Sequence, residues 1–228
     1  MTNTFRQVAA ADSPDPCEPA PMAATGYPPL AGLSAAGVVL HYAQDRAIYH
    51  EGSDAGVFFR VVSGVVRTCA YFSNGRRQIE AFHFAGDVFG FEAGNAQSLS
   101  AEAVCSCTVL SYHWRGPGMP AATERLSRQL LLHAMAGHAQ AQRHAIMLGR
   151  GSAVEKVAAF LAECVRCPRD HDVITLAVTR QDIADYLGLT IETVSRTLTR
   201  LERDGVIEVT AGRTIRVTDP AALQQIND

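Results

Sequence analysis

The sequence predicts an α+β protein in which an antiparallel β-domain, one long helix and a compact, mainly helical domain follow one another. Short apolar runs separated by glycines occupy residues 38–114, with the spacing of an antiparallel sandwich or barrel. A helical stripe of apolar side chains follows over residues 121–150, and two short helical patterns occupy residues 179–201. With 228 residues and 47% hydrophobic content, the chain can form one or two domains with cores of their own.

The overall composition excludes several classes of protein. The formal net charge is −3, so any surface that binds nucleic acid must be a local basic patch. No apolar run approaches a membrane span and the N-terminus lacks a signal-peptide core, so we expect no membrane partner and a cytoplasmic location. In that reducing compartment the six cysteines are expected to be thiols.

Residues 1–29 are predicted to be a mobile tail, because prolines are spread among small and polar residues that cannot bury a core. Residues 30–120 are predicted to form the β-domain, with turns at Gly52, Gly64, residues 74–75 and residues 86–87.

Two cysteines of the β-domain, Cys105 and Cys107, alternate with their neighbours, so both are expected on one face of a strand. They are either a redox or metal pair or two small buried side chains, and we favour the second because free cysteine is usually buried.

The helix predicted over residues 121–149 has its bulky side chains on one stripe with alanines between them. Such a stripe forms either a coiled-coil-like dimer seam or the face that packs on the chain's own β-domain. In the first case the contact residues of the dimer helix would be Leu126, Leu130, Met135, Ala141 and Ile146.

Residues 150–228 are predicted to form the third domain. Ser152 caps its first helix, with Glu155 as the capping-box partner. Cys164 and Cys167 form a CxxC pair near the end of that helix. No second pair occurs at zinc-finger spacing, so packing or exposure is favoured over a metal or redox role. A strand within residues 170–178 is expected to follow.

The stretch 179–201 predicts two helices joined by a tight turn, which is a helix-turn-helix. Thr179 caps the first helix with Asp182 as its partner, Gly188 ends it, and Thr190 caps the second helix. The polar outer face of the second helix suits base recognition. Its residues are Glu192, Thr193, Ser195, Arg196, Thr199 and Arg200.

A hairpin is predicted beyond Gly205 with its turn at residues 211–212, which makes the domain a winged helix-turn-helix. Hydroxyl and guanidinium groups around the motif are suited to contacts with the DNA backbone. The candidates are Thr179, Arg180, Thr190, Thr193, Arg200 and Arg213, the last of these near the tip of the wing.

The segment IETVSR, inside DIADYLGLTIETVSRTLTRLERDGVI, resembles the recognition helix of the Crp/Fnr superfamily of bacterial transcription regulators, with the Fnr-type E-x-x-S-R pattern. The resemblance covers about residues 30–217, and SNGRRQI is similar to the FixK branch. It implies that Glu192, Ser195 and Arg196 read bases. Their chemistry agrees, since Arg196 can bind guanine, Glu192 can accept from cytosine, and Ser195 fits against a thymine methyl.

The resemblance also implies an architecture and a role. The β-domain would be a β-roll (jelly roll) of the cyclic-nucleotide-binding type, and the long helix would join two chains so that two recognition helices meet two half-sites of double-stranded DNA. TTGAT-like palindromes and mainly activation of genes for low-oxygen respiration or nitrogen fixation are implied. RNA polymerase would contact an exposed loop, for which we expect the hairpin tip Ser73, Asn74 and Gly75.

No cofactor or metal is expected. Cyclic-nucleotide sensors of the superfamily hold their ligand with a glutamate and an arginine, whereas the corresponding segment here has Glu92 and no arginine. The iron–sulfur cluster of Fnr needs several N-terminal cysteines, and this tail has Cys17 alone. The alternative is an effector-gated regulator that responds to a small molecule, haem or thiol redox state. No catalytic motif such as G-x-S-x-G, HExxH or Walker A occurs, so an enzyme is not expected.

Overall fold

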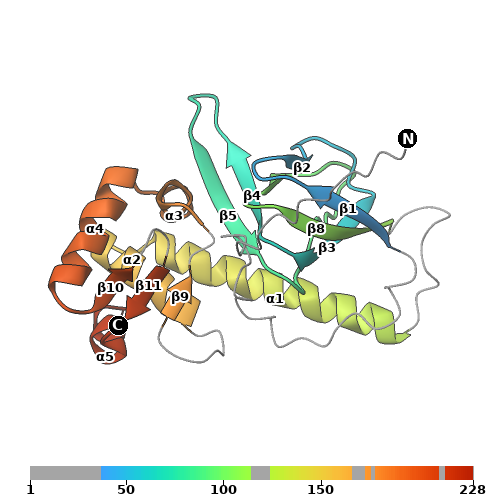
Figure 1. The fold of residues 1–228 in the computed structure, drawn as a ribbon. Helices are drawn as coiled ribbons and strands as arrows, with labels where there is room; N and C mark the ends of the chain where they lie inside the picture. The colour runs from blue at the N-terminus through green and yellow to red at the C-terminus, as the bar shows by residue number, and fades with distance from the viewer. Residues whose placement is uncertain (1–36, 114–123, 166–172, 176–177, 211–213, 228) are drawn as a thin grey trace, which may run out of the picture.

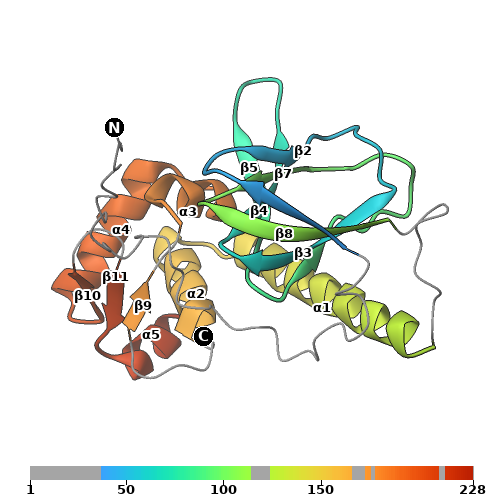
Figure 2. The same cartoon turned by 45° about the vertical axis from the view of Figure 1, so that its right-hand side comes forward.

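The structure is a computed structural model that describes residues 37–113, 124–165, 173–175, 178–210 and 214–227. The β-domain and a mainly helical C-terminal domain lie at the two ends of one long helix (Figures 1 and 2). No helix in the described ranges is both long and apolar enough to cross a membrane. The predicted tail, Cys17, Cys167 and Arg213 lie outside the described residues.

The β-domain consists of two four-stranded antiparallel sheets, ordered β1-β8-β3-β6 and β2-β7-β4-β5. The strands are β1 (Val38–Tyr42), β2 (Ala47–Tyr49), β3 (Val57–Ser63), β4 (Val66–Tyr71), β5 (Arg77–His83), β6 (Val88–Phe89), β7 (Ser100–Ala103) and β8 (Cys107–His113). Phe59 and Val109 from the first sheet pack against Val66 and Ala101 from the second. The predicted double-sheet β-roll is therefore confirmed.

Glycines with positive φ occupy the predicted turns of this domain. At Gly64, between β3 and β4, φ is +82° and an added Cβ would lie 2.5 Å from the backbone oxygen of Ser106. Both the backbone conformation and the close approach of the neighbouring chain segment therefore require glycine there.

The prediction that Cys105 and Cys107 share one face of a strand is wrong. Strand β8 begins at Cys107, and a bend at residues 104–106 turns Cys105 into a different part of the core. Cys105 is disulfide-bonded, which also corrects the expectation that every cysteine is a thiol. Cys69 and Cys107 are free thiols. Burial raises the pKa of Cys69 and Cys107 to about 11, so both stay protonated at neutral pH.

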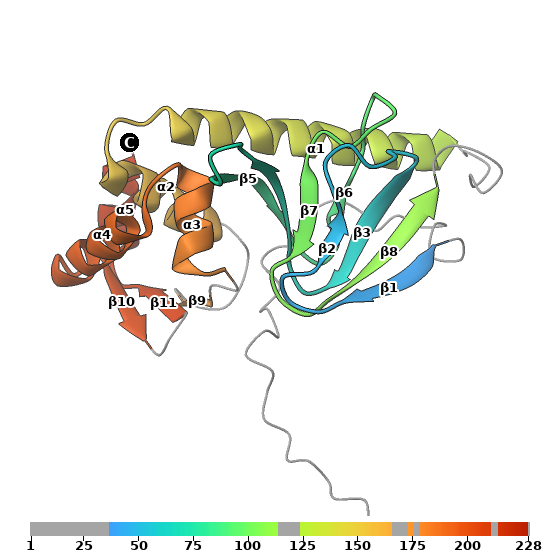
Figure 3. The ribbon, with the colours of Figure 1, turned by 90° about the horizontal axis from the view of Figure 1, so that it is seen from above.

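Helix α1 (Glu124–Leu148) runs alongside the β-domain and on to the C-terminal domain (Figure 3). It has two apolar faces where the sequence suggested one stripe. Leu130 packs on Phe58 and Tyr112 of its own β-domain, whereas Met135 and Ile146 are 61% and 67% exposed. Leu130 therefore faces its own β-domain and not the outward face of the helix. The sequence did not predict this, because helical spacing alone does not distinguish two adjacent apolar faces. Ala141 is partly exposed, and the side chain of Leu126 lies outside the described residues.

The C-terminal domain combines four helices with a small sheet ordered β10-β11-β9. Its elements are α2 (Ala153–Val165), β9 (Val173–Thr175), α3 (Arg180–Leu187), α4 (Ile191–Arg203), β10 (Ile207–Thr210), β11 (Thr214–Val217) and α5 (Pro220–Asn227). The Ser152–Glu155 capping box is confirmed, with N–H to side-chain oxygen distances of 3.2 and 3.4 Å. The sequence reading missed α5. The Asp219-Pro220 pair is a helix-start signal in the sequence. In the structure Asp219 caps α5, because its Oδ1 accepts from the backbone N–H of Ala222.

One hydrophobic cluster crosses the boundary between the two domains. It includes Ile79 and Phe82 from β5 together with Phe160 of α2 and Tyr186 and Leu187 of α3. The C-terminal domain is thus packed on the β-domain of the same chain and not merely tethered to it. This packing positions the site described next.

Candidate nucleic-acid interface

Helix α3 begins and ends where the sequence predicts. Thr179 Oγ1 accepts a hydrogen bond from the backbone of Asp182, and Asp182 Oδ2 accepts from the backbone of Thr179, both at 3.1 Å. Gly188 ends the helix in the left-handed conformation, with φ +63°. The reciprocal cap at one end and the glycine at the other make α3 a short, well-bounded helix.

The turn after Gly188 brings α4 against α3. Thr190 caps α4 by accepting from the backbone of Thr193 at 3.3 Å. The two helices meet through buried side chains on their facing sides, which are Ile183, Ala184, Leu187, Val194, Leu198 and Leu201. This packing fixes which face of α4 points outward, and it is the helix-turn-helix geometry that the sequence predicts.

The predicted base-reading residues share the outer face of α4. Glu192 and Arg196 are exposed and Ser195 is half-buried beside them. An open hollow on this face is lined by Ser195, Arg196, Thr199, Arg200 and Arg203. Together these residues offer guanidinium donors, hydroxyls and one carboxylate to a ligand that approaches from outside.

The charges on this face are arranged for polar recognition. A hydrogen bond from the first turn of the helix, the Thr190 hydroxyl and the nearby Arg196 hold the pKa of Glu192 below its ordinary value. Glu192 is therefore a carboxylate, and only an acceptor, at neutral pH. Arg196 Nη2 lies 3.5 Å from Thr193 Oγ1, a weak contact that leaves the guanidinium available to a ligand.

The other predicted DNA contacts surround this face. Arg180 is exposed at the first position of α3, and Thr179 is half-buried at its cap. Arg200 is exposed and lies 3.6 Å from Asp204. The wing strands β10 and β11 pair in register, and Val209 is tied to α4 by its N–H, which donates to Glu202 Oε1 at 3.1 Å.

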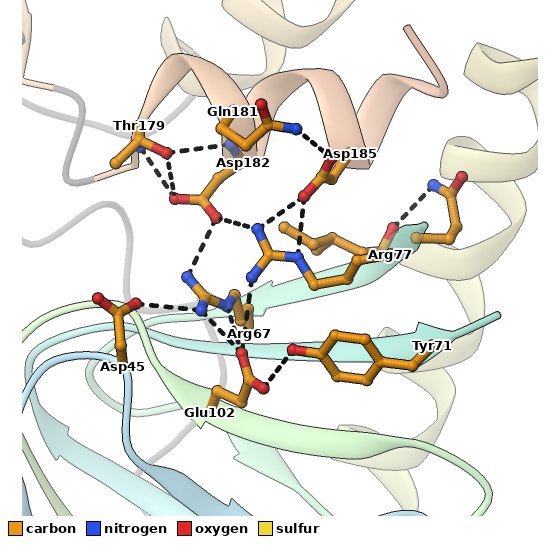
Figure 4. A network of polar contacts seen from close by, with 11 residues as sticks. Asp45, Arg67, Tyr71, Arg77, Glu102, Thr179, Gln181, Asp182 and Asp185 are labelled. Carbon is orange, nitrogen blue, oxygen red and sulfur yellow. Dashed lines mark hydrogen bonds and ion pairs between the residues drawn. The ribbon is translucent and has the colours of Figure 1, made fainter. Parts of the chain in front are cut away.

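An ion-pair network that the sequence reading missed joins α3 to the β-domain (Figure 4). Arg67 Nη1 donates to Asp182 Oδ1 at 3.1 Å, and Arg77 Nη2 donates to the same oxygen at 2.8 Å. Arg77 Nε also donates to Asp185 Oδ2 at 2.8 Å. The side chains of Arg67 and Asp182 are 7% and 3% exposed. The available signal was Arg67 as the one charged residue of strand β4, since a buried cation requires a partner.

Two more carboxylates bind Arg67 on the β-domain side, Glu102 and the more exposed Asp45. Glu102 Oε2 accepts from Arg67 Nη2 at 2.7 Å, and Tyr71 donates its hydroxyl proton to Glu102 Oε1. Burial opposes the charged form of Arg77, but the hydrogen bond to Asp185 and the charge of Asp182 outweigh it and raise its pKa. Burial likewise opposes ionisation of Glu102, but Tyr71 and Arg67 lower its pKa overall. Arg77 and Glu102 are therefore both charged at neutral pH.

Tyr186 of α3 forms a second, mostly apolar anchor. Its ring stacks on His144 of α1 at a centroid distance of 3.9 Å and an interplanar angle of 2°. Its backbone oxygen lies 2.8 Å from His144 Nε2 and accepts from Gln78 Nε2 at 3.0 Å. Phe82 of β5 packs on the same ring, with a distance of 5.3 Å between the two ring centroids. Helix α3 thus contacts both the β-domain and the long helix.

Glu92 belongs to the β-domain segment that is expected not to bind a cyclic nucleotide, and its carboxylate is hydrogen-bonded within the β-domain. Glu92 Oε1 accepts from the backbone and the hydroxyl of Ser98, at 2.9 and 2.5 Å. Within the described residues, no cluster of three or more His, Cys, Asp or Glu could hold a metal ion.

The predicted polymerase contact lies at the tip of the β4–β5 hairpin, where Ser73, Asn74 and Gly75 are exposed. Asn74 Oδ1 accepts from the backbone of Arg76 at 3.1 Å, and Gly75 has φ +79°. The tip is therefore an ordered turn whose side chains face solvent.

Two family models match the chain, one for each domain. The Crp-like helix-turn-helix domain matches residues 155–226, and the cyclic nucleotide-binding domain matches residues 39–114. Together the matched ranges contain the recognition helix, the wing and almost the whole β-roll.

Similar proteins span nearly the same length. The nitrogen fixation regulation protein FixK of Rhizobium meliloti is 40% identical over 196 residues, covering 86% of this chain and 90% of that protein. The FixK protein of Azorhizobium caulinodans is 39% identical, covering 87% and 83%. The fumarate and nitrate reduction regulatory protein of Escherichia coli is 30% identical, covering 79% and 75%. Among solved structures, FixK2 from Bradyrhizobium japonicum has a TM-score of 0.76 and 35% identity, covering 84% of this chain and 98% of that one.

Proposed function

Because the chain belongs to the Crp/Fnr superfamily and is similar to the FixK regulators, it is a DNA-binding transcription regulator and not an enzyme, and we propose that it binds palindromic operators with TTGAT-like half-sites as a homodimer. The observation that carries this proposal is the outer face of α4, which presents Glu192, Ser195 and Arg196 to solvent. An ionised Glu192 accepts from a cytosine amino group, Arg196 donates two hydrogen bonds to guanine, and Ser195 packs beside a thymine methyl.

Backbone contacts would set the register of the protein on the duplex. Arg180 and Thr179 at the start of α3, with Thr190, Thr193 and Arg200 around α4, offer donors to phosphate on the side of the motif that faces outward. Arg213, which lies between β10 and β11 in the sequence, is proposed as a further phosphate contact. These contacts raise affinity for any sequence, whereas the α4 residues give specificity.

The homodimer is proposed to form through the outward face of α1. Leu131, Met135 and Ile146 are exposed there, and they lie four, then eleven residues apart, which places them on one stripe of the helix. A second copy that buried this stripe would also supply the second recognition helix, as a palindrome requires.

The names of the relatives support a proposal for the class of target genes. Two similar proteins carry the name nitrogen fixation regulation protein FixK, and a more distant one is named for fumarate and nitrate reduction. We therefore propose that this regulator acts in the cytoplasm, mainly as an activator of nitrogen-fixation or low-oxygen respiration genes.

Activation is proposed to involve the tip of the β4–β5 hairpin, where Ser73, Asn74 and Gly75 would touch RNA polymerase. Asn74→Ala should lower transcription from a target promoter in vitro while operator occupancy stays unchanged. Unchanged transcription at full occupancy would exclude this contact.

The proposed function is tested by DNase I footprinting and fluorescence anisotropy on a TTGAT palindrome, with a scrambled palindrome of equal length as the control. Specific affinity at physiological salt should exceed the affinity for the scrambled DNA by at least about 10³-fold. Equal affinity for both duplexes would refute sequence-specific binding.

A second candidate is an effector-gated regulator, favoured by the match of the β-roll to the cyclic nucleotide-binding family over residues 39–114. We prefer binding without a cofactor, because Glu92 is already paired with Ser98. A thermal-shift screen against cyclic nucleotides and haem separates the two, since only a gated regulator gains both stability and DNA affinity from a ligand.

A further inference from the structure

Four buried or nearly buried ionic side chains, Arg67, Arg77, Asp182 and Asp185, join the β-domain to the first helix of the helix-turn-helix. We call this group the arginine clamp. Both guanidinium groups converge on one oxygen, Asp182 Oδ1, at 3.1 and 2.8 Å (Figure 4). Asp182 also completes the capping box of α3. The two arginines therefore bind a side chain that is held rigidly at the start of that helix.

The clamp leaves little freedom for rotation of α3. Arg77 forks across two carboxylates one helical turn apart, with Nη2 at 2.8 Å from Asp182 and Nε at 2.8 Å from Asp185. A planar fork of this kind fixes direction as well as distance, which a single ammonium group does not. The four side chains are 3% to 15% exposed, so solvent ions screen them weakly.

An independent contact fixes α3 from its other end. Tyr186 stacks on His144 of α1, and its backbone oxygen accepts from Gln78 of β5. The clamp and this anchor together relate α3 to α1, the helix proposed as the dimer seam. Because α4 packs directly on α3, the orientation of the recognition helix relative to the dimer axis follows from these contacts.

We propose that Arg67 and Arg77 are positioning residues that set the operator half-site spacing by holding α3, and with it α4, at a fixed angle to the dimer helix. The inference rests on the proposed function and deepens it. In a symmetric dimer, a change of one base pair between half-sites both translates and rotates one half-site relative to the other. A rigidly held pair of recognition helices therefore accepts one spacing, whereas a loosened pair accepts several.

The test uses the full chain and a series of palindromes that differ only in the number of base pairs between the half-sites. The variants are Arg77→Lys, which keeps the charge but loses the fork, and Asp185→Asn, which removes one acceptor. The matched control is Arg143→Gln, which breaks the ion pair between Arg143 Nε of α1 and Glu163 Oε1 of α2, at 3.1 Å, and changes none of the four clamp residues. The measured quantity is the ratio of Kd values between the preferred spacing and a spacing changed by one base pair.

The wild-type protein and the control should discriminate strongly between spacings. Each clamp variant should lose about tenfold in this ratio, equivalent to about 1.4 kcal/mol. A merely stabilising pair would change the melting temperature and leave the spacing ratio unchanged.

The outcomes are distinct. A reduced ratio in both clamp variants, with the control unchanged, supports the proposal. An unchanged ratio in folded variants overturns it. Tighter binding by the variants at every spacing also overturns it, since the clamp would then hold an arrangement unsuited to DNA. The wild-type protein is measured first. If it binds no palindrome at any spacing, the proposed function itself is refuted, whereas the variants test only the positioning role of the clamp.

Discussion

Arg77 of β5 donates from Nη2 to Asp182 Oδ1 across 2.8 Å, although the two residues are 105 positions apart in the chain. The same carboxylate accepts through Oδ2 from the backbone of Thr179 and so completes the cap of α3. One buried side chain therefore serves both the local structure of the helix-turn-helix and its attachment to the β-domain.

Replacing Asp182 should be far more destabilising than replacing its capping partner. Asp182→Ala leaves two buried guanidinium groups short of an acceptor and is expected to lower the free energy of unfolding by about 3–5 kcal/mol. Thr179→Ala loses mainly the cap and should cost about 1 kcal/mol. Urea denaturation followed by circular dichroism measures both. Equal losses would mean that the arginines find other partners when Asp182 is absent.

Arg196→Ala should weaken binding to the specific operator by about 1–3 kcal/mol and relax the choice of one base pair. Glu192→Ala should change the preference at a different base pair. Arg200→Ala is the matched control on the same helix, because a phosphate contact weakens binding to all sequences alike. Anisotropy titrations against operators with single base changes separate these patterns. Unaltered base preference in Arg196→Ala would remove Arg196 from the base-reading set.

The two faces of α1 predict opposite effects of substitution. Ile146→Glu or Met135→Glu places a charge on the exposed stripe and should shift the protein toward monomer while its fold is kept. Leu130→Ala opens a gap beside Phe58 and Tyr112, so it should lower stability, by about 2–3 kcal/mol for this half-buried side chain, without changing the association state. Analytical ultracentrifugation and thermal melts distinguish these results. A dimer that persists in both Glu variants would place the interface elsewhere.

His83 predicts a pH dependence of stability. Burial lowers the pKa of this ring from about 6.5 to about 4. Its Nε2 lies 3.1 Å from the Thr68 hydroxyl, which donates its proton to Glu80. Between these two values the unfolded chain binds the proton and the folded protein does not, so stability falls as pH drops from 7 toward 4. For this partly exposed ring the loss at pH 5 is on the order of 1–2 kcal/mol.

His83→Gln should remove that part of the pH dependence, since glutamine does not titrate. Urea unfolding at pH 7.5 and pH 5 compares the wild-type protein with the variant. The difference in unfolding free energy between the two pH values should be smaller in His83→Gln. An identical difference in both proteins would show that other groups carry the acid sensitivity.

Local chemistry made the helix-turn-helix predictable. The Thr179–Asp182 cap, Gly188 and the Thr190 cap each depend on neighbours within a few residues, and all three have the predicted geometry. The glycine turns of the β-roll were predictable for the same reason. Family resemblance then assigned roles to Glu192 and its neighbours, which the exposed face of α4 accommodates.

Long-range pairing was not predictable from one sequence. Nothing near Arg67 indicates that its partner is Asp182, 115 positions away, because the partner is chosen by how the domains pack. The cysteine prediction failed similarly, since the bend at residues 104–106 separates Cys105 from Cys107. The apolar stripe on α1 was predicted as a single face. Only the packing of the β-domain against α1 shows which of its apolar side chains face inward and which face outward.

The most direct test of the account is aerobic binding of the purified, full-length protein to a TTGAT palindrome with no ligand or metal added. We expect a specific complex of two chains per palindrome, with Kd in the range of about 10⁻⁸ M or tighter at physiological salt, and its loss on the scrambled duplex. Binding that arises only after a small molecule, haem or a reductant is added would contradict regulation without a cofactor. Absence of specific binding under every condition would contradict the assignment of α4 as the recognition helix.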